Sequence, residues 1–353
     1  MKAVRLHKLN DLCYEEIKLP ELKDDEILIK VEACGICGSD IPRAFELGAH
    51  VYPLVLGHEF AGTVVKTANE NDEMLIGKTA AVFPIIPCFE CENCKAGHYA
   101  QCENYNYLGS RCDGAFAEYC IVPSKWHLIF SNNPNVSMEA LCMVEPATVA
   151  QHAIRKSELQ AGQTAVIVGA GPIGMMAARW AKIFGAKRVA LIDINQEKVE
   201  FSRNLGFEVY NSKEVDVVKT IQEFTDNKGV NVVIEGTGTS SGLNQAIEMV
   251  KAFGTIVLMG NPHQNTMIEL KNHSQILRKE IQLKGVWNSI YSDALANEWK
   301  YTVDMMDQEK LQVEDLITHK AGLSDVCDLF HKINNHEITI CKAIYSAKCN
   351  ERK

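Results

Sequence analysis

Apolar and polar residues alternate along this chain with two different periods. From about residue 150 to 287, short apolar runs such as VNVVIEGTG, GTIVLMG and IQLKGVW alternate with longer amphipathic stretches such as NQEKVEFSRNL and GLNQAIEMVKAF. The clearest unit, residues 164–193, is an apolar strand, a glycine turn, an apolar-faced helix and a second strand that ends in an acid. Repeated alternation of strands and helices predicts a doubly wound parallel sheet with helices on both faces.

The first 149 residues follow a different pattern. Short segments that alternate apolar and polar positions, such as EILIKVEACGIC and FAEYCIV, are broken by glycine and proline. This predicts an irregular β-rich domain. After residue 287 the chain carries two helical stretches, 294–307 and 323–333, and one late strand near 343–346. We expect residues 288–353 to return and complete the domain of residues 1–149, with 150–287 as the second domain.

Size and charge narrow the function. A chain of 353 residues exceeds the size at which one core usually keeps growing, which agrees with two domains. The formal net charge of -9 argues against a nucleic-acid partner and gives no reason to expect a membrane partner. No signal-peptide core and no run of about 18 apolar residues is present, so we expect a cytoplasmic protein. In that reducing compartment, clustered cysteines among the 13 indicate metal ligation before disulfides.

The glycine turn after the first strand of the parallel sheet predicts a dinucleotide site. Gly169 permits the tight turn, Gly171 lets the backbone approach a pyrophosphate, and Gly174 lets the helix pack close to the strand. The acid that ends the second strand can accept hydrogen bonds from a ribose diol and would repel a 2′-phosphate, which favours NAD over NADP. The predicted cofactor contacts are Gly169, Gly171, Pro172, Ile173, Gly174 and Asp193.

Two weaker points belong to the same domain. The glycines could instead serve only a tight turn in some other doubly wound domain, although the complete strand, turn, helix and acid argue against that. The segment EGTGTSSG, residues 235–242, ends a later strand and is a candidate second cofactor contact, or simply another turn.

A cysteine loop in the β-rich domain predicts a structural zinc site. Its cysteines are spaced at three, three and eight residues: Cys88, Cys91, Cys94 and Cys102. Closely spaced thiolates form a closed tetrahedral site with no position for a substrate. The alternatives are four free thiols or a nucleic-acid-binding zinc module. Glu90, Glu92 and Glu103 interleave the cysteines and would repel phosphates, which argues against the second.

A second set of metal ligands is more dispersed. Cys37 and His58 are residue types that suit zinc, and each lies beside glycine, where the backbone can bend to aim a side chain. Glu145, just before Pro146, could add a third and harder ligand and leave one coordination position open. Taken singly, each of these is more often a buried cysteine, an ordinary histidine or a surface glutamate.

These motifs together resemble the medium-chain, zinc-dependent alcohol and polyol dehydrogenases. The resemblance spans nearly the whole chain and is carried by Cys37-Gly38-Ser39-Asp40, Gly57-His58-Glu59, the cysteine loop, Glu145-Pro146, the glycine turn and Asp193. It implies a GroES-like catalytic domain beside a Rossmann domain, two zinc ions per chain, and a homodimer or homotetramer. The glutamate at 145 is similar to that of the polyol branch.

The resemblance also implies roles for individual residues. A catalytic zinc would be held by Cys37, His58 and Glu145, with water or Glu59 as the fourth ligand, and would lower the pKa of a bound alcohol. Ser39 resembles the hydroxyl that receives the alcohol proton. Many relatives carry a histidine three residues later, whereas this chain has Pro42, so we expect bound water to continue the proton path.

Further segments narrow the expected substrate. GSDIPR, GAHVYPLVLGHEF, GSRCDGAFAEY and LRKEIQLKGVW resemble the branch that oxidises galactitol 1-phosphate to a keto-hexose phosphate such as tagatose 6-phosphate. The candidate phosphate ligands are Arg43, His50, Arg111 and Lys279, each of which could equally be a solvated surface residue. The alternatives are an unphosphorylated polyol dehydrogenase of the sorbitol or L-iditol type and, ranked lower, a non-catalytic zinc- and nucleotide-binding member.

Overall fold

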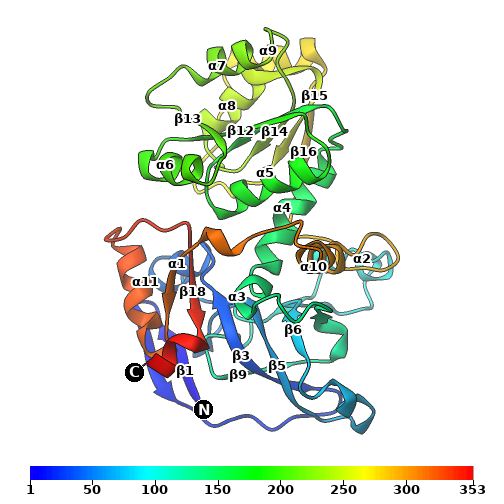
Figure 1. Cartoon of the computed structure of the whole chain (residues 1–353), viewed down its shortest axis with the longest axis vertical. Coiled ribbons are helices and arrows are strands. Elements are labelled where there is room, and N and C mark those ends of the chain that lie inside the picture. The colour runs from blue at the N-terminus through cyan, green and yellow to red at the C-terminus, as the bar shows by residue number, and fades with distance from the viewer. Residues whose placement is uncertain (353) are drawn as a thin grey trace. The chain divides into compact units, whose positions relative to one another are not determined.

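The computed structural model describes residues 1–352 and divides the chain into two units (Figure 1). One contains Met1–Pro146 and the residues from Ile290 onward, and the other contains Ala147–Ser289. From the sequence pattern we expected boundaries after residues 149 and 287. Among the described residues, no helix is both long and apolar enough to cross a bilayer.

The second unit is built on one parallel sheet. Its six strands lie in the order β13-β12-β11-β14-β15-β16, and every neighbouring pair is parallel. The strands are β11 (Thr164–Val168), β12 (Arg188–Asp193), β13 (Glu208–Asn211), β14 (Val230–Glu235), β15 (Val250–Leu258) and β16 (Gln282–Gly285). The connecting helices are α5 (Pro172–Ile183), α6 (Gln196–Asn204), α7 (Val217–Phe224), α8 (Ser240–Met249) and α9 (Leu270–Lys279).

The central strands of this sheet are apolar because helices cover both faces. Val166 and Ile167 of β11 are fully buried although their side chains point to opposite faces. The chain order reverses between β11 and β14, so the carboxyl ends of these two strands mark the switch point at which such sheets bind ligands. The glycine turn follows β11 directly.

The first unit is mainly antiparallel. A seven-stranded sheet has the order β10-β6-β5-β3-β18-β17 with β9 also paired to β3, and smaller sheets contain β2-β1-β4 and β7-β8. The strands are β1 (Lys2–Lys8), β2 (Asp11–Glu16), β3 (Ile27–Gly35), β4 (Leu54–Val55), β5 (Glu59–Thr67), β6 (Thr79–Val82), β7 (Ile85–Ile86), β8 (Asn106–Tyr107), β9 (Tyr119–Val122), β10 (Leu128–Phe130), β17 (Ile317–Ala321) and β18 (Lys342–Ser346).

Short helices connect these strands. They are α1 (Asp40–Phe45), α2 (Glu92–Lys95), α3 (Met138–Leu141), α10 (Glu298–Asp307) and α11 (Val326–Asn334), with 3-10 turns η1 (Glu70–Leu75), η2 (Tyr99–Gln101), η3 (Lys125–His127), η4 (Glu314–Leu316), η5 (Leu323–Asp325) and η6 (Ala347–Arg352). A further helix, α4 (Val144–Lys156), begins in this unit and continues into the next.

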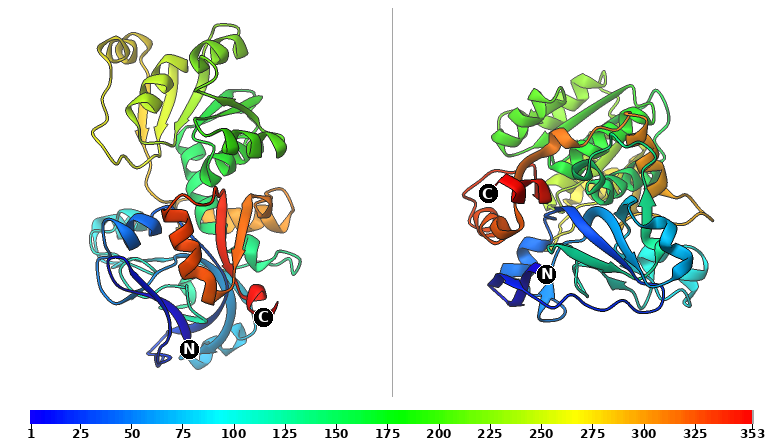
Figure 2. Two further views of the ribbon diagram at one scale, coloured as in Figure 1. Left: turned by 90° about the vertical axis from the view of Figure 1, so that its left-hand side faces the viewer. Right: turned by 60° about the horizontal axis from the view of Figure 1, so that its bottom comes forward.

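The C-terminal segment joins the first unit through strand pairing. β18 pairs antiparallel with β3, with Ile344 opposite Gly35, and β17 pairs parallel with β18. Figure 2 shows this orange and red segment beside the blue N-terminal strands. The sequence pattern indicated β18 but not β17, whose residues alternate between half-buried and exposed and therefore lack an apolar face. The pairing places the start of β18 beside the end of β3, where the candidate metal ligands begin.

Candidate functional site

The pairing of β3 with β5 brings the first metal-donor candidates together. Cys37 follows the end of β3, Glu59 begins β5, and Gly35 pairs with Glu59 across the ladder. The donor atoms of Cys37, His58 and Glu59 all lie within 4.8 Å of one another. His58 and Glu59 are buried, which is unusual for these residue types and indicates a specific partner. The group therefore brings together the sulfur of half-buried Cys37, a buried imidazole and a buried carboxylate.

Two glycines make this arrangement sterically possible. A Cβ on Gly35 would lie 2.2 Å from Glu59 Oε2. Gly57 has φ +97°, and a Cβ there would lie 2.7 Å from Cys34 Sγ. Because L-residues with side chains rarely adopt that φ, glycine is required at 57 for both reasons. Gly35 thus lets the Glu59 side chain approach the backbone closely, and Gly57 lets the chain bend before His58.

Asp40 orients the imidazole and the loop after β3. It is fully buried, and its Oδ1 lies 3.6 Å from His58 Nδ1. Its other oxygen, Oδ2, accepts a hydrogen bond of 3.0 Å from the backbone N–H of Cys37. Burial raises the pKa of Asp40, and the positive charges of His58 and Arg43 partly offset that effect. A carboxylate at one ring nitrogen is the usual outer partner of a metal-binding histidine.

The charge balance around His58 favours a cation. Burial by itself lowers the pKa of His58, but the negative charges of Asp40 and Cys37 outweigh it and raise that pKa to about 10. The same negative charges also attract a metal ion, which would take the place of the proton. Together with the donor types, this fits zinc, which binds thiolate, imidazole and carboxylate and in catalytic sites keeps one position open.

Glu145 lies beside this group but is held by a different partner. It is in the first turn of α4, is buried, and accepts a 3.3 Å hydrogen bond at Oε1 from the hydroxyl of Tyr107. Burial is the main reason that its pKa is raised to about 7, while the charge of His58 acts in the opposite direction. Its donor atom is not among the three within 4.8 Å of one another. The carboxylate within 4.8 Å of both Cys37 and His58 in this group is that of Glu59.

Lys342 is a site residue that sequence reasoning missed. It begins β18, is 3% exposed, contacts Glu59 Oε2, and donates a 2.9 Å hydrogen bond to the carbonyl of Ile36. Burial lowers its pKa, but the adjacent Glu59 carboxylate dominates and the pKa is raised overall. The signal available in the sequence was a lysine beside the apolar run of β18. Only strand pairing shows that it reaches Glu59.

Ser39 lies next to the candidate metal ligands. It precedes α1, and its hydroxyl donates a 3.3 Å hydrogen bond to Cys37 Sγ instead of capping the helix. The residue is exposed, so its hydroxyl is accessible to a small molecule. Pro42 lies within α1 and offers no titratable group for a proton path.

The second group of metal-donor candidates is the cysteine loop. The four sulfurs of Cys88, Cys91, Cys94 and Cys102 lie within 4.8 Å of one another. The sulfurs of Cys88 and Cys94 are 3.9 Å apart. A tetrahedral zinc with bonds of about 2.3 Å requires sulfurs about 3.8 Å apart, so the loop already has the dimensions of such a site. Backbone N–H donors lower the pKa of Cys91 to about 6, which favours the thiolate that binds metal.

An aromatic cluster supports this loop. Phe89 and Tyr99, both within the loop, contact the indole of Trp126 at centroid distances of 5.0 and 5.1 Å. Trp126 also contacts Tyr291 at 4.9 Å. Gly97, with φ +80°, approaches so closely that a Cβ would lie 2.5 Å from Ser292 Oγ. The loop is therefore packed against the body of the first unit.

In the second unit, the glycine turn has the geometry that a dinucleotide needs. Gly169 has φ +108°, and a Cβ on Gly174 would lie 1.9 Å from Gly169 O. A Cβ on Gly171 would have no neighbour within 4 Å, so the backbone there faces open space. Pro172 is the first residue of α5 and Ile173 follows it, so the helix N-terminus adjoins that space.

Two acids fix the loops at the carboxyl edge of this sheet. Asp193 accepts hydrogen bonds of 2.8 Å from Ala170 N and 2.9 Å from Asn195 N, one on each oxygen. Glu235 ends β14, is 2% exposed, and accepts from the backbone N–H groups of Thr237 and Gly238. Glu235 therefore stiffens the segment that we expect to be a second cofactor contact.

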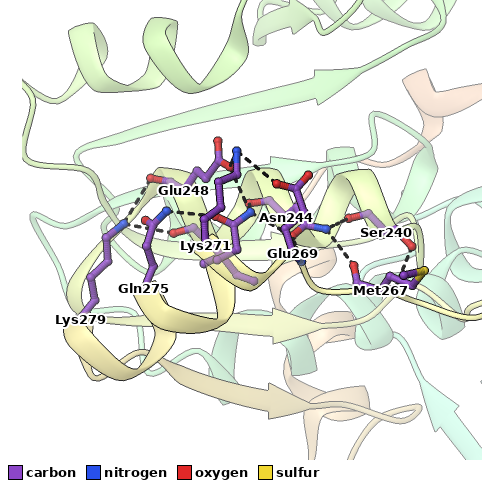
Figure 3. Close-up of polar contacts among 10 residues, drawn as sticks. Ser240, Asn244, Glu248, Met267, Glu269, Lys271, Gln275 and Lys279 are labelled. Atoms are coloured by element: carbon purple, nitrogen blue, oxygen red, sulfur yellow. Dashed lines mark hydrogen bonds and ion pairs between the residues drawn. The ribbon is translucent and has the colours of Figure 1, made fainter.

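The four cations expected near a phosphate lie in different surroundings. Arg43 donates to Asp40 at 2.7 Å, and His50 is exposed. The Arg111 guanidinium lies 4.3 Å from the ring centre of Tyr105. Lys279 donates to the carbonyls of Ile247, Glu248 and Val250 at the C-terminal end of α8 (Figure 3). The ammonium of Lys279 therefore caps a helix, within the polar network that joins α8 to α9.

Comparisons with known proteins agree with this description. The model for the alcohol dehydrogenase GroES-like domain matches residues 23–131, and that for zinc-binding dehydrogenase matches residues 172–308. Galactitol 1-phosphate 5-dehydrogenase of Escherichia coli K12 is 34% identical over 87% of this chain and 89% of that protein. The crystal structure of galactitol-1-phosphate dehydrogenase from Escherichia coli matches with a TM-score of 0.90, at 31% identity over 98% of this chain and all of that one.

Two other proteins are nearly as similar. Sorbitol dehydrogenase of Bacillus subtilis is 31% identical over 94% of this chain and 93% of that protein. A zinc-binding dehydrogenase of Sinorhizobium meliloti, solved bound to NADP, matches with a TM-score of 0.89 at 28% identity and 98% coverage of both chains. The expected fold class and family resemblance are confirmed: the chain is a member of the zinc-dependent alcohol dehydrogenase family of oxidoreductases.

Proposed function

We propose that this chain oxidises a secondary alcohol of a hexitol phosphate, galactitol 1-phosphate to a keto-hexose phosphate such as tagatose 6-phosphate, with NAD as hydride acceptor. The observation that carries the chemistry is the group of half-buried Cys37 and buried His58 and Glu59, with Glu145 beside it. The substrate rests on the 34% identity to the galactitol 1-phosphate enzyme.

Zinc is the metal that these donors suit. Cys37, His58 and Glu145 would hold it, with Glu59 or water as the fourth ligand, and the cysteine loop would hold a second, structural zinc. When bound, the catalytic ion acts as a Lewis acid that lowers the pKa of an alcohol toward neutrality. Removal of zinc by a chelator should abolish activity, and added zinc should restore it. Full activity in a sample whose zinc content is measured as zero would contradict the metal's role.

Protein groups position the alcohol and take its proton. Ser39 is accessible, and its hydroxyl already donates to Cys37 Sγ, so it lies where an alcohol near the metal would place its own hydroxyl. The substrate loses one proton to Ser39 and one hydride to NAD, which leaves a ketone and reduced cofactor. Because Pro42 cannot carry the proton onward, bound water continues the path. Ser39→Ala should lower the rate and change its pH profile.

Asp193 supports the choice of NAD. Two backbone N–H groups hold its carboxylate at the end of β12, which is where a ribose diol meets the second strand of such a sheet. A fixed negative charge there opposes a 2′-phosphate. The Sinorhizobium relative was solved with NADP, so the choice requires a direct measurement. Binding titrations should show NAD bound more tightly, and Asp193→Ala should reduce the difference; equal binding of both cofactors would contradict the assignment.

Arg111 is the phosphate ligand we favour among the four candidates. Arg43 is already paired with Asp40, and Lys279 caps α8. Arg111 is held over Tyr105, whose ring lies next to Tyr107 at 6.3 Å, and Tyr107 in turn contacts Glu145. A fixed guanidinium near the metal donors suits phosphate, which arginine binds through paired hydrogen bonds.

An unphosphorylated polyol is the second candidate substrate. Sorbitol dehydrogenase of Bacillus subtilis is 31% identical over 94% of this chain, only slightly below the first relative. Initial rates with NAD on galactitol 1-phosphate, free galactitol and sorbitol separate the two. We expect the phosphate ester to be preferred, and Arg111→Leu to raise its KM without changing the KM for free polyols. Preference for the free polyols would reject the phosphate proposal, and no NADH formation on any alcohol would favour a non-catalytic member.

The remaining proposals concern stoichiometry and assembly. We expect two zinc ions per chain by elemental analysis and a homodimer or homotetramer by light scattering. A measured content of one zinc per chain would show that only one of the two proposed zinc sites is occupied, and would contradict the other. A monomer at micromolar concentration would reject the assembly that the family resemblance implies.

A further inference from the structure

Tyr107 contacts two of the groups that surround the candidate catalytic site. Its hydroxyl donates to Glu145 Oε1 at 3.3 Å. Its ring packs edge-on against the imidazole of His58, with a centroid distance of 5.6 Å and an interplanar angle of 77°. One side chain thus restrains a carboxylate and an imidazole that come from different segments of the chain.

The backbone of Tyr107 is itself firmly held. The residue ends β8 and pairs with Ile85 of β7. Its carbonyl accepts backbone hydrogen bonds from Ser110, Arg111 and Cys112 at 3.2, 2.8 and 3.2 Å. A side chain on so constrained a backbone has few alternative positions, which is the condition for holding its neighbours within a fraction of an ångström.

The two carboxylates of the candidate metal site, Glu59 and Glu145, contact partners that differ in charge. Glu59 contacts the ammonium of Lys342, which offsets its negative charge. Glu145 accepts from the neutral phenol of Tyr107. A neutral donor fixes the direction of a carboxylate while leaving its charge available to a cation. At this contact the Glu145 carboxylate is therefore oriented by a donor that carries no charge of its own.

We propose that Tyr107 is a positioning residue of the metal site, whose hydroxyl aims the Glu145 carboxylate and whose ring fixes the His58 imidazole. This proposal rests on the zinc role proposed above for Cys37, His58 and Glu145. Partners that orient metal ligands typically contribute about 10-fold to 100-fold to metal affinity or activity. Tyr107 acts through these two residues and contacts both.

Tyr107→Phe is the variant that separates the hydroxyl from the ring. It keeps the packing against His58 and removes the donor to Glu145. We expect cobalt to bind the catalytic site about 10-fold more weakly, measured by competition with a chromogenic chelator. The visible spectrum of the cobalt-loaded protein should also change, while the contribution of the cysteine loop stays constant. Tyr14→Phe is the matched control, because Tyr14 is an exposed tyrosine of β2 in the same unit.

A double-mutant cycle tests whether Tyr107 acts through Glu145. In the Glu145→Ala background, Tyr107→Phe should have little further effect on cobalt affinity, because the side-chain acceptor that the hydroxyl orients is gone. Additive losses would show that Tyr107 acts elsewhere, and an unchanged affinity and spectrum in Tyr107→Phe alone would also overturn the proposal.

Fold and function controls keep the outcome interpretable. The melting temperature of metal-free Tyr107→Phe should equal that of the metal-free wild type; a drop large enough to account for the lost affinity would reduce Tyr107 to a structural residue and reject the proposal. If wild-type protein binds cobalt at the catalytic site but oxidises no alcohol, the proposed reaction is rejected. The role of Tyr107 is then still decided by the double-mutant cycle, which measures cobalt affinity alone.

Discussion

The two groups of metal-donor candidates in the first unit are built in opposite ways. The cysteine loop takes all four sulfurs from residues 88–102, and its dimensions follow from spacing within one short segment. The group of Cys37, His58 and Glu59 depends on the pairing of β3 with β5, on Asp40 from α1 and on Lys342 from β18. One donor set is local and uniform, and the other is assembled by the sheet and chemically mixed. The comparison teaches that one short segment can supply a complete set of four identical donors. A set of different donors needs side chains and backbone pairing from several segments.

Among these variants, Cys37→Ala should produce the largest effect. It should lower catalytic activity and leave the stability of the metal-free protein nearly unchanged. Loss of a ligand that helps hold the Lewis acid removes several kcal/mol of transition-state stabilisation, so we expect kcat/KM to fall about 10³-fold or more. The melting temperature of the metal-free variant should stay within a few degrees of wild type. Cys13→Ala, which removes a half-buried thiol of β2 that belongs to neither donor group, serves as the control for cysteine loss.

Cys94→Ser should affect stability first. Cys94 is buried in the loop, and without its thiolate the structural zinc proposed there would be lost, which we expect to cost about 4 kcal/mol of unfolding free energy. Elemental analysis should find one zinc fewer per chain, and urea titration should show the lower midpoint. If Cys94→Ser keeps the zinc content and the urea midpoint of the wild type, the cysteine loop does not stabilise the fold through a metal, and the contrast between the two groups is wrong.

Lys342→Met should lower the free energy of unfolding, because Lys342 balances the charge of Glu59 in the group of Cys37, His58 and Glu59. Removing one partner of a buried ion pair leaves Glu59 uncompensated and costs about 3 kcal/mol. Adding Glu59→Gln should recover part of that loss, because the unpaired charge disappears with it. Urea unfolding of the metal-free single and double variants measures both steps. Equal stability of Lys342→Met and wild type would mean that the lysine is not needed to balance Glu59.

His127 should give the smallest effect, as a pH dependence of the first unit. Burial lowers the pKa of this histidine to about 4, so between the unfolded value near 6.5 and that pKa the unfolded chain binds more protons than the folded chain. Stability therefore falls as pH decreases through this window, by about 1 kcal/mol between pH 7 and pH 5.5. His127→Phe should remove that part of the slope. An unchanged slope would show that another group titrates there.

The fold was largely predictable because its signals are local. The change from period-two segments to alternating strands and helices predicted both domain types, and the glycine turn after β11 marked the switch point of the parallel sheet. β17 was missed because it has no apolar face.

The restraints on the candidate site were not predictable in the same way. The spacing of the cysteine loop and the motifs around Cys37 and His58 indicated metal donors, and the structure brings these donors close together. Lys342 and Tyr107 reach them only through strand pairing and a hairpin, which no local spacing encodes. The contact of Lys279, one of the candidate phosphate ligands, with carbonyls at the end of α8 was likewise not encoded in local spacing.

The packing of Phe89 and Tyr99 against Trp126 gives the cysteine loop an optical reporter. Loop residues lie on the indole from two directions, so any rearrangement of the loop changes the surroundings of a natural fluorophore. The chain has four tryptophans, and Trp126 is one that contacts rings of this loop. If the loop binds the proposed zinc, removal of that metal should be measurable as a change in emission, separately from loss of activity and without attaching a dye.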